Sequence, residues 1–205
     1  MEFDHITFQG PPIDDTEIHS RLPDDLRNLL SQLNGFIQFH GGLHVRGACK
    51  APAWHSIREA WIGDSAFHKN YRTITPQDIP FAQDCVGDQF ILRSGLVIRL
   101  RTETGDLEDL NMALFPFLET AQQTPIDTLG LQPLMQYQTD GSNLPPGQLL
   151  SIYPPFCTKE SASGVSIRGI PTEERLAFLA DFYQQTANLA DGEQFRITVT
   201  GRKGD

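Results

Sequence analysis

The sequence predicts an α+β fold built on an antiparallel sheet, and three observations lead to that prediction. The chain has 205 residues, 39% of them hydrophobic, which is enough to bury a core without disulfides or metals. Some segments alternate apolar and polar residues as strands do, whereas others repeat apolar residues with helical spacing. Helices and short strands follow one another irregularly around one hairpin, which is typical of α+β proteins.

The first predicted helix covers residues 22–33. Its leucines recur three or four positions apart on one face: Leu22, Leu26, Leu29, Leu30 and Leu33. Its start is capped at Ser20 or at Pro23, where two aspartates follow the proline and suit the positive end of the helix dipole. Asn34-Gly35 supplies the stop.

Short apolar segments at 36–39 and 43–45 follow, separated by Gly41-Gly42, and predict a strand pair or one bulged strand. Trp54, Ile57 and Trp61 then lie three and four residues apart, which predicts a helix that Gly63 ends. We interpret both tryptophans as core residues in the first instance.

The clearest local signal is an antiparallel hairpin of residues 88–93 and 96–101. Apolar and polar side chains alternate along both segments, and Ser94-Gly95 lies between them, where a two-residue turn needs positive φ. Residues 79–82 precede it as a further apolar segment, and a polar turn at 103–106 follows it.

The rest of the chain predicts two helices, a linker and a strand. A helix-like cluster begins near Met112, and Pro116 must occupy its first turn or break it. Residues 124–158, rich in Pro, Gly, Gln and Thr, are interpreted as a wrapping linker whose apolar side chains are buried: Leu149, Leu150, Ile152, Tyr153 and Phe156. We expect a helix at 171–183 and a strand at 194–200. The predicted division is a domain of residues 1–122 and a C-terminal extension of 123–205 that packs on the same core.

Composition limits the class of protein. The formal net charge of -10 disfavours binding to nucleic acid or anionic lipid, because both require cationic surface, and it favours a basic protein partner. No apolar run approaches membrane-helix length, and the N-terminus lacks a secretory signal, so we expect a cytoplasmic protein. Three widely spaced cysteines predict buried thiols and neither disulfides nor a zinc ribbon.

The sequence offers few residues in patterns typical of catalysis. The common short motifs for nucleotides, phosphates, acyl transfer and zinc are absent, so we expect no enzyme activity, no catalytic residues and no cofactor. His40 and His44 have a spacing that a metal site could use on a regular strand, but surface or core histidines are the favoured interpretation. Cys85 lies near Asp84 and Asp88, which raise a thiol pKa, and is expected to be structural.

The charge distribution is uneven. Between Arg101 and Lys159 there is no Lys or Arg, and the acids just after the hairpin are the candidate contacts for a cationic partner: Glu103, Asp106, Glu108 and Asp109. A polar turn should present them to solvent. Two alternatives stay open. The acids serve only solubility, or a partner uses the concave side of the sheet through Trp54, Trp61 or Tyr71.

Several of these segments together resemble the SUKH superfamily, which includes yeast cell-wall assembly regulators and many bacterial immunity proteins. The resemblance covers about residues 15–120 and rests on a proline, a leucine helix and Asn34-Gly35, followed by Gly87-Asp88-Gln89-Phe90 and Ser94-Gly95-Leu96-Val97. It implies an α+β domain in which a helix ending in Asn-Gly leads into a curved antiparallel sheet flanked by helices.

The resemblance also implies a function without catalysis. In this respect the chain resembles bacterial members of the superfamily, which neutralise a toxin, frequently a nuclease, by stoichiometric binding. The expectation is therefore an immunity protein with a cognate toxin domain as its basic partner. The alternative is a regulatory or scaffolding domain that binds an endogenous protein.

Overall fold

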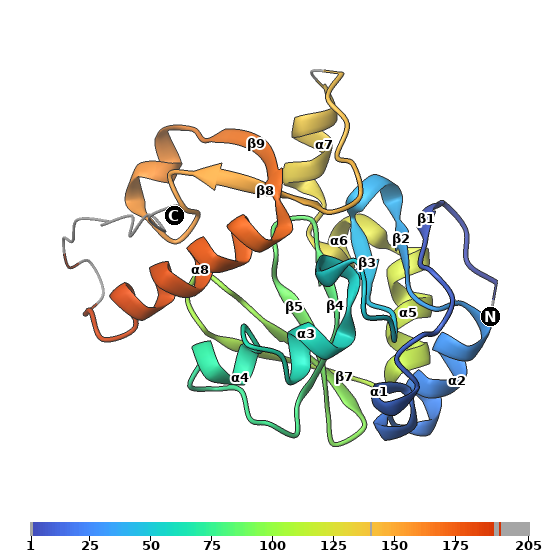
Figure 1. Ribbon diagram of the computed structural model, residues 1–205. Coiled ribbons are helices and arrows are strands. Elements are labelled where there is room, and N and C mark those ends of the chain that lie inside the picture. The colour runs from blue at the N-terminus through green and yellow to red at the C-terminus, as the bar shows by residue number, and fades with distance from the viewer. Residues whose placement is uncertain (1, 140, 191–192, 194–205) are drawn as a thin grey trace, which may run out of the picture.

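Seven strands form one antiparallel sheet in which every strand pairs with its neighbours in sequence (Figure 1). The computed structural model describes residues 2–139, 141–190 and 193. The strands of this sheet are β1 (Ile6–Gln9), β2 (Phe36–Gln38), β3 (Leu43–Val45), β4 (Ile79–Asp84), β5 (Gln89–Arg93), β6 (Leu96–Leu100) and β7 (Leu107–Met112). A second, two-stranded sheet pairs β8 (Gln148–Tyr153) with β9 (Ser166–Pro171).

Helices surround both sheets, so the α+β fold class predicted from the sequence is confirmed. The α-helices are α1 (Thr16–Arg21), α2 (Asp24–Gln32), α3 (Ile57–Trp61), α4 (Phe67–Asn70), α5 (Leu114–Gln123), α6 (Pro125–Leu129), α7 (Gln132–Thr139) and α8 (Thr172–Thr186). Short 3₁₀ turns lie at 39–41, 53–55 and 159–163. In the part of the chain that the structure describes, no helix combines the length and apolar character that crossing a membrane requires.

The predicted hairpin is confirmed. β5 and β6 pair in antiparallel register, with Arg93 opposite Leu96 across the turn. The two turn residues, Ser94 and Gly95, have φ angles of 52° and 85°. Positive φ at both positions is the geometry of a type I′ turn, whose twist matches that of the flanking strands. The strand pair predicted at 36–39 and 43–45 is also present, as β2 and β3.

The predicted helix at 22–33 begins later than expected. Leu22 has an extended backbone and separates α1 from α2, because a residue that precedes proline avoids the helical region. α1 itself was not predicted, although its N-cap is clear: the Asp15 carboxylate accepts a hydrogen bond from the Ile18 N–H at 3.1 Å.

The helix predicted from Trp54 to Trp61 is wrong in its first half. Ser56 is extended, and it divides a 3₁₀ turn at 53–55 from α3. The cause is tertiary, because residues on both sides of Ser56 bond to Gly47: the Gly47 N–H donates to the His55 carbonyl and the Ile57 N–H to the Gly47 carbonyl.

The sequence pattern does not predict β7, which follows directly after the polar turn at the edge of the sheet. Only Leu107, Leu110 and Met112 on this strand are half-buried, so its apolar signal is weak. The helix expected near Met112 begins at Leu114 as α5, and Pro116 lies in its first turn, where its missing N–H costs no hydrogen bond.

The interpretation of residues 124–158 as a linker is wrong, because this segment forms α6, α7 and β8. Leu149, Leu150 and Ile152 are buried as expected, but Tyr153 and Phe156 are exposed. β9 was not predicted, and it completes the second sheet with β8. The helix predicted at 171–183 is confirmed as α8. The strand predicted at 194–200 lies outside the described residues.

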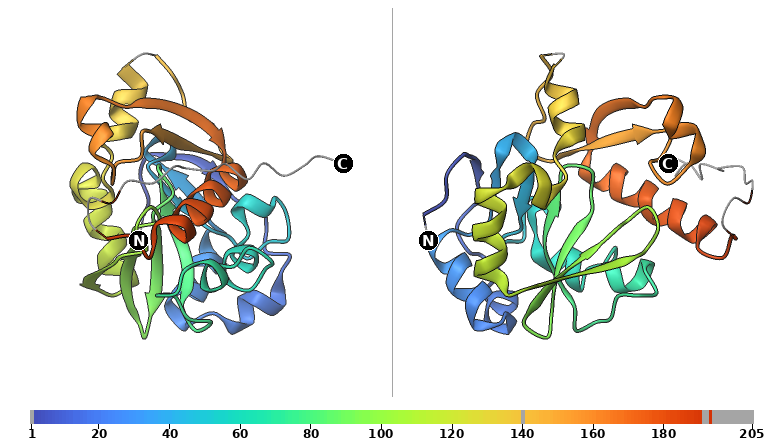
Figure 2. Two further views of the ribbon diagram at one scale, coloured as in Figure 1. Left: turned by 90° about the vertical axis from the view of Figure 1, so that its left-hand side faces the viewer. Right: turned by 180° about the vertical axis from the view of Figure 1, so that it is seen from behind.

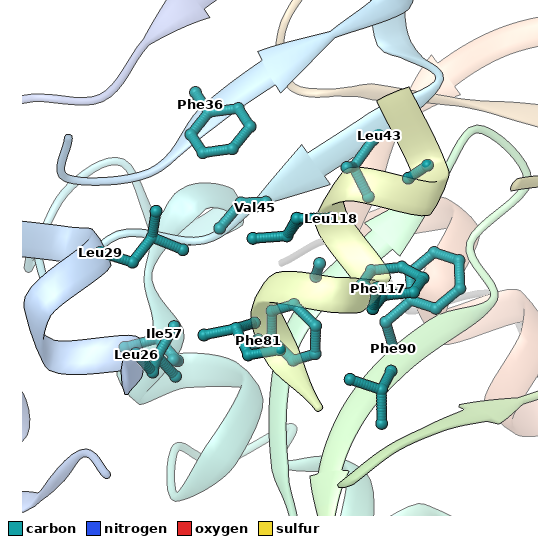
Figure 3. Close-up of a cluster of buried hydrophobic side chains, with 14 of the residues drawn as sticks. Leu26, Leu29, Phe36, Leu43, Val45, Ile57, Phe81, Phe90, Phe117 and Leu118 are labelled. Atoms are coloured by element: carbon teal, nitrogen blue, oxygen red, sulfur yellow. The ribbon is translucent and has the colours of Figure 1, made fainter. Parts of the chain in front are cut away.

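Both faces of the β5–β6 hairpin bear buried hydrophobic side chains. Phe90 and Val97 point into one hydrophobic cluster with Phe117 of α5, as Figure 3 shows for Phe90 and Phe117. Their neighbours Ile91 and Ile98 belong to a second cluster. Figure 1 shows α3, α4 and α8 on the near side of the sheet, and the view from behind in Figure 2 shows α5 on the other side.

Candidate functional site: a cleft and an acidic edge

A cleft of about 470 Å³ opens between α8 and the segment that carries α3 and α4. Its walls are largely aromatic and aliphatic: Trp54, Ala60, Phe67, Tyr71 and Leu176. Three buried polar residues, Arg46, Ser56 and Thr172, also line it. A concave apolar surface with a few polar groups is the usual form of a ligand site.

Arg46 has a buried guanidinium that bonds only to neutral acceptors. Nη1 donates to the Pro80 carbonyl at 3.0 Å, and Nη2 donates to the side-chain oxygens of Gln83 and Gln89 at 2.6 and 2.8 Å. Its Cζ lies 5.7 Å from the ring centroid of Phe67. Burial lowers the pKa of Arg46 to about 9, which leaves the group charged at neutral pH.

A chain of hydrogen bonds runs from this arginine into the sheet. The Gln83 amide nitrogen lies 3.2 Å from His44 Nδ1, His44 Nε2 lies 2.8 Å from His55 Nδ1, and His55 Nε2 lies 3.2 Å from the Asn34 carbonyl. Since a carbonyl can only accept, His55 must donate through Nε2, and the other bonds then follow in one direction. Every link is satisfied when both imidazoles are neutral.

Burial keeps both imidazoles neutral. It lowers the pKa of His55 to about 4, although the hydrogen bond to Asn34 acts in the opposite sense. The pKa of His44 lies well below its ordinary value, because of burial first and then of the nearby His55 and Arg46.

Ser56 is the second buried polar residue in the cleft. Only 1% of its surface is exposed, and its hydroxyl oxygen has no hydrogen-bond partner among the described residues. Leaving such a group unpaired costs on the order of 1–3 kcal/mol. Ser56 is thus a lining residue of the cleft whose hydroxyl is unsatisfied within the described residues.

The predicted acidic residues lie at the β7 edge of the sheet, in the turn before β7 and on β7 itself. We call Asp106, Glu108 and Asp109 the acidic edge, because all three are exposed there. The Glu108 carboxylate accepts a hydrogen bond from Arg101 Nη2 at 2.8 Å, and Asp106 accepts one from the Thr104 hydroxyl at 2.7 Å. Asp109 lies opposite Ile98 of β6.

Glu103 does not belong to this exposed group, which corrects the expectation that the turn presents all four acids to solvent. Only 14% of its side chain is exposed, and its Oε1 lies 3.6 Å from Arg175 Nη2. The Glu103 carboxylate also accepts a hydrogen bond from the Cys157 N–H. Burial raises the pKa of Glu103, against the attraction of Arg175. Its contacts tie the turn to α8 and to the segment after β8.

The three aromatic candidates divide between the core and the cleft. Trp61 is buried and donates its indole N–H to the Pro76 carbonyl at 3.0 Å. Tyr71 is 2% exposed, stacks on Tyr183 at 4.8 Å and lines the cleft. Trp54 is half-buried and lines the cleft as well. Of the three, only Trp54 offers an appreciable exposed surface.

His40 and His44 do not share a site. His40 is exposed in the 3₁₀ turn after β2, whereas His44 is buried against His55. The described residues contain no group of three His, Cys, Asp or Glu side chains placed to hold a metal.

The cysteines differ in their surroundings. Cys49 and Cys85 are buried as expected, but Cys157 is exposed. Burial raises the pKa of Cys85 well above its ordinary value, and the Asp84 carboxylate adds to the effect, so Cys85 has the predicted character of an unreactive thiol.

Arginine side chains are largely used inside the molecule. Arg46, Arg99 and Arg175 are buried. Four others form ion pairs with carboxylates of the same chain: Arg27, Arg58, Arg93 and Arg101. The cationic charge available at the surface is thus smaller than the composition suggests.

The sequence predicted the three residues of the acidic edge and two aromatic residues that line the cleft, Trp54 and Tyr71. It did not predict the buried polar residues of the cleft, Arg46, Ser56 and Thr172. The one available signal was an arginine inside the apolar stretch Leu43–Cys49. Whether such an arginine meets a carboxylate depends on β4 and β5, which are distant in sequence.

Comparison with known proteins gives one informative likeness. No family model matches the chain, and no curated protein matches it. Among solved structures, it is similar to Atu4351 from Agrobacterium tumefaciens, with a TM-score of 0.51 and 11% sequence identity over 85% of each chain. At that identity the likeness concerns the fold alone. Membership of the SUKH superfamily stays a prediction from the sequence.

Proposed function

We propose that this chain is a non-catalytic protein-binding module, a cytoplasmic immunity protein that neutralises a basic toxin domain by stoichiometric binding. The observation that carries the proposal is the surface charge. The chain has a formal net charge of -10. Much of its arginine is buried or paired internally, whereas Asp106 and Asp109 are exposed.

An acidic surface suits this function because of the charge expected on the partner. A toxin that attacks nucleic acid needs a cationic surface around its substrate site. An acidic protein is steered toward that surface, associates quickly and occludes it, without any reactive group of its own. The sequence resemblance to the SUKH superfamily points in the same direction.

Neutralisation is the direct test. The tagged chain is used to capture its partner from the source organism, the partner is identified by mass spectrometry, and the two are then produced together. We expect a toxin domain whose activity is abolished at a 1:1 ratio and whose expression alone stops growth. A captured toxin that stays active in the complex contradicts the proposal. An endogenous protein without toxicity in its place supports the regulatory alternative.

Charge reversal then locates the contact. Asp106→Lys with Asp109→Lys should slow association with the captured toxin at least tenfold and flatten its dependence on salt. These two positions avoid the ion pairs of Glu103 and Glu108 with their arginines. The control is Glu173→Lys with Glu174→Lys, which changes net charge equally at the start of α8. Equal effects of the two variants would assign the attraction to net charge and not to the acidic edge.

A further inference from the structure

We propose that the cleft between α8 and the α3–α4 segment is a binding site for a small organic monocarboxylate. The carboxylate would meet Arg46 and Ser56, and the apolar body would lie between the aromatic walls. This site is separate from the acidic edge and does not depend on the proposed function.

Arg46 has hydrogen-bond donors that the folded chain does not use. A guanidinium has five N–H donors, and three of them have acceptors here: the Pro80 carbonyl and the two glutamine side chains. The Nε–H and one Nη1–H have no acceptor among the described residues. A buried cation is costly without an anion, and a carboxylate that bonds to the free donors would supply one.

Ser56 adds an unsatisfied polar group that carries no charge. Ser56 comes from a different segment than Arg46, yet it lines the same cleft, and its buried hydroxyl lacks a partner in the described part of the chain. A hydroxyl can donate to a carboxylate oxygen. Two residues with unsatisfied polar groups thus line one apolar cleft.

The walls and mouth of the cleft narrow the class of ligand. Phe67, Tyr71 and Leu176 favour a flat or aliphatic body. Glu59, Glu173 and Asp181 also line the cleft, and the two glutamates are exposed, so three carboxylates lie around the site. These acids repel polyanions such as phosphates and nucleotides, whereas a single carboxylate that reaches the buried arginine is less affected.

The test compares 2-naphthoate with its neutral isostere 2-naphthamide by isothermal titration calorimetry. We expect naphthoate to bind with 1:1 stoichiometry and naphthamide to bind at least tenfold more weakly. In NMR spectra of the folded protein, naphthoate should shift the Arg46 Nε–H resonance. Inorganic phosphate should produce no binding heat and should leave the Arg46 Nε–H resonance unchanged.

Two variants on α8 locate the site without disturbing Arg46. Ala177→Phe fills the cleft from an exposed lining position and should weaken naphthoate binding at least tenfold. Glu174→Phe places the same ring at an exposed position that does not line the cleft, and binding should be unchanged. No naphthoate binding, equal affinity for the amide, or full affinity in Ala177→Phe would each overturn the proposal.

Discussion

At the scale of single residues, buried polar side chains are held by directed hydrogen bonds that fix their protonation. The path from Arg46 through Gln83, His44 and His55 to the Asn34 carbonyl requires two neutral imidazoles. A proton added to either ring would set two N–H groups against each other. Such a network makes the fold sensitive to acid.

This sensitivity can be measured at His55. The pKa of His55 in the folded protein, about 4, lies below the ordinary value of 6.5. Below pH 6.5 His55 therefore binds protons more readily in the unfolded chain, and the free energy of unfolding decreases as the pH decreases. The stability advantage of the wild type over His55→Gln should shrink by on the order of 1 kcal/mol per pH unit between about pH 6.5 and 4.5. Urea unfolding at several pH values measures it.

The wild type has to be compared with His55→Gln because Asp84 changes the free energy of unfolding with pH in the opposite direction. Burial and the neighbouring Asp88 raise the pKa of Asp84, and that shift favours the folded state as pH falls. It is present in both proteins and cancels. A constant difference for His55→Gln from pH 7.5 to 5 would contradict the neutral network.

Asp15 combines two roles in one buried carboxylate. It caps α1 through Ile18 and accepts two hydrogen bonds from Arg58, whose guanidinium lowers the pKa of Asp15. Asp15→Ala removes the cap and leaves Arg58 without its main partner. We expect a loss of about 2 kcal/mol in the free energy of unfolding by urea. Asp25→Ala, at an exposed position in the first turn of α2, should lose well under about 1 kcal/mol; similar losses would refute the dual role.

At the scale of elements, the hairpin depends on the backbone of its turn. Gly95 has φ of 85°, and an added Cβ would meet no atom within 4 Å. The cost of a side chain there is therefore backbone strain alone. Gly95→Val should lower the free energy of unfolding by about 1–2 kcal/mol.

The matched variant is Gly95→Asn, because asparagine tolerates the left-handed region better than a β-branched residue does. It should lose less than half as much in the same thermal or urea unfolding experiment. Equal losses in the two variants would mean that the turn does not keep positive φ in solution.

At the scale of the whole molecule, the C-terminal part completes the second hydrophobic cluster. Tyr183 of α8 is 6% exposed, stacks on Tyr71 and lies so close to Gly105 that an added Cβ there would be 2.2 Å from its ring. Tyr183→Ala should cost about 3 kcal/mol in unfolding free energy. Tyr153→Ala removes the same atoms at a 64% exposed position and should cost little. Comparable costs would show that α8 does not pack here in solution.

The sequence by itself determined the elements whose signal is local. The leucine face of α2, the alternation around Ser94-Gly95 and the acidic first turn of α8 are each complete within about fifteen residues. Composition likewise determined the acidic character of the chain. In each case the physical cause, side-chain period or charge, is carried by neighbouring residues.

Only the tertiary structure decided the rest. β7 and β9 have weak patterns of their own and exist because β6 and β8 offer hydrogen-bonding edges. The sequence predicts Glu103 to be exposed, but the structure places it beside Arg175, which is distant in sequence, and largely buries it. Arg46 became a candidate ligand contact because β4 and β5 bring it glutamines and no carboxylate. Burial and charge pairing arise between distant segments, and no local pattern records them.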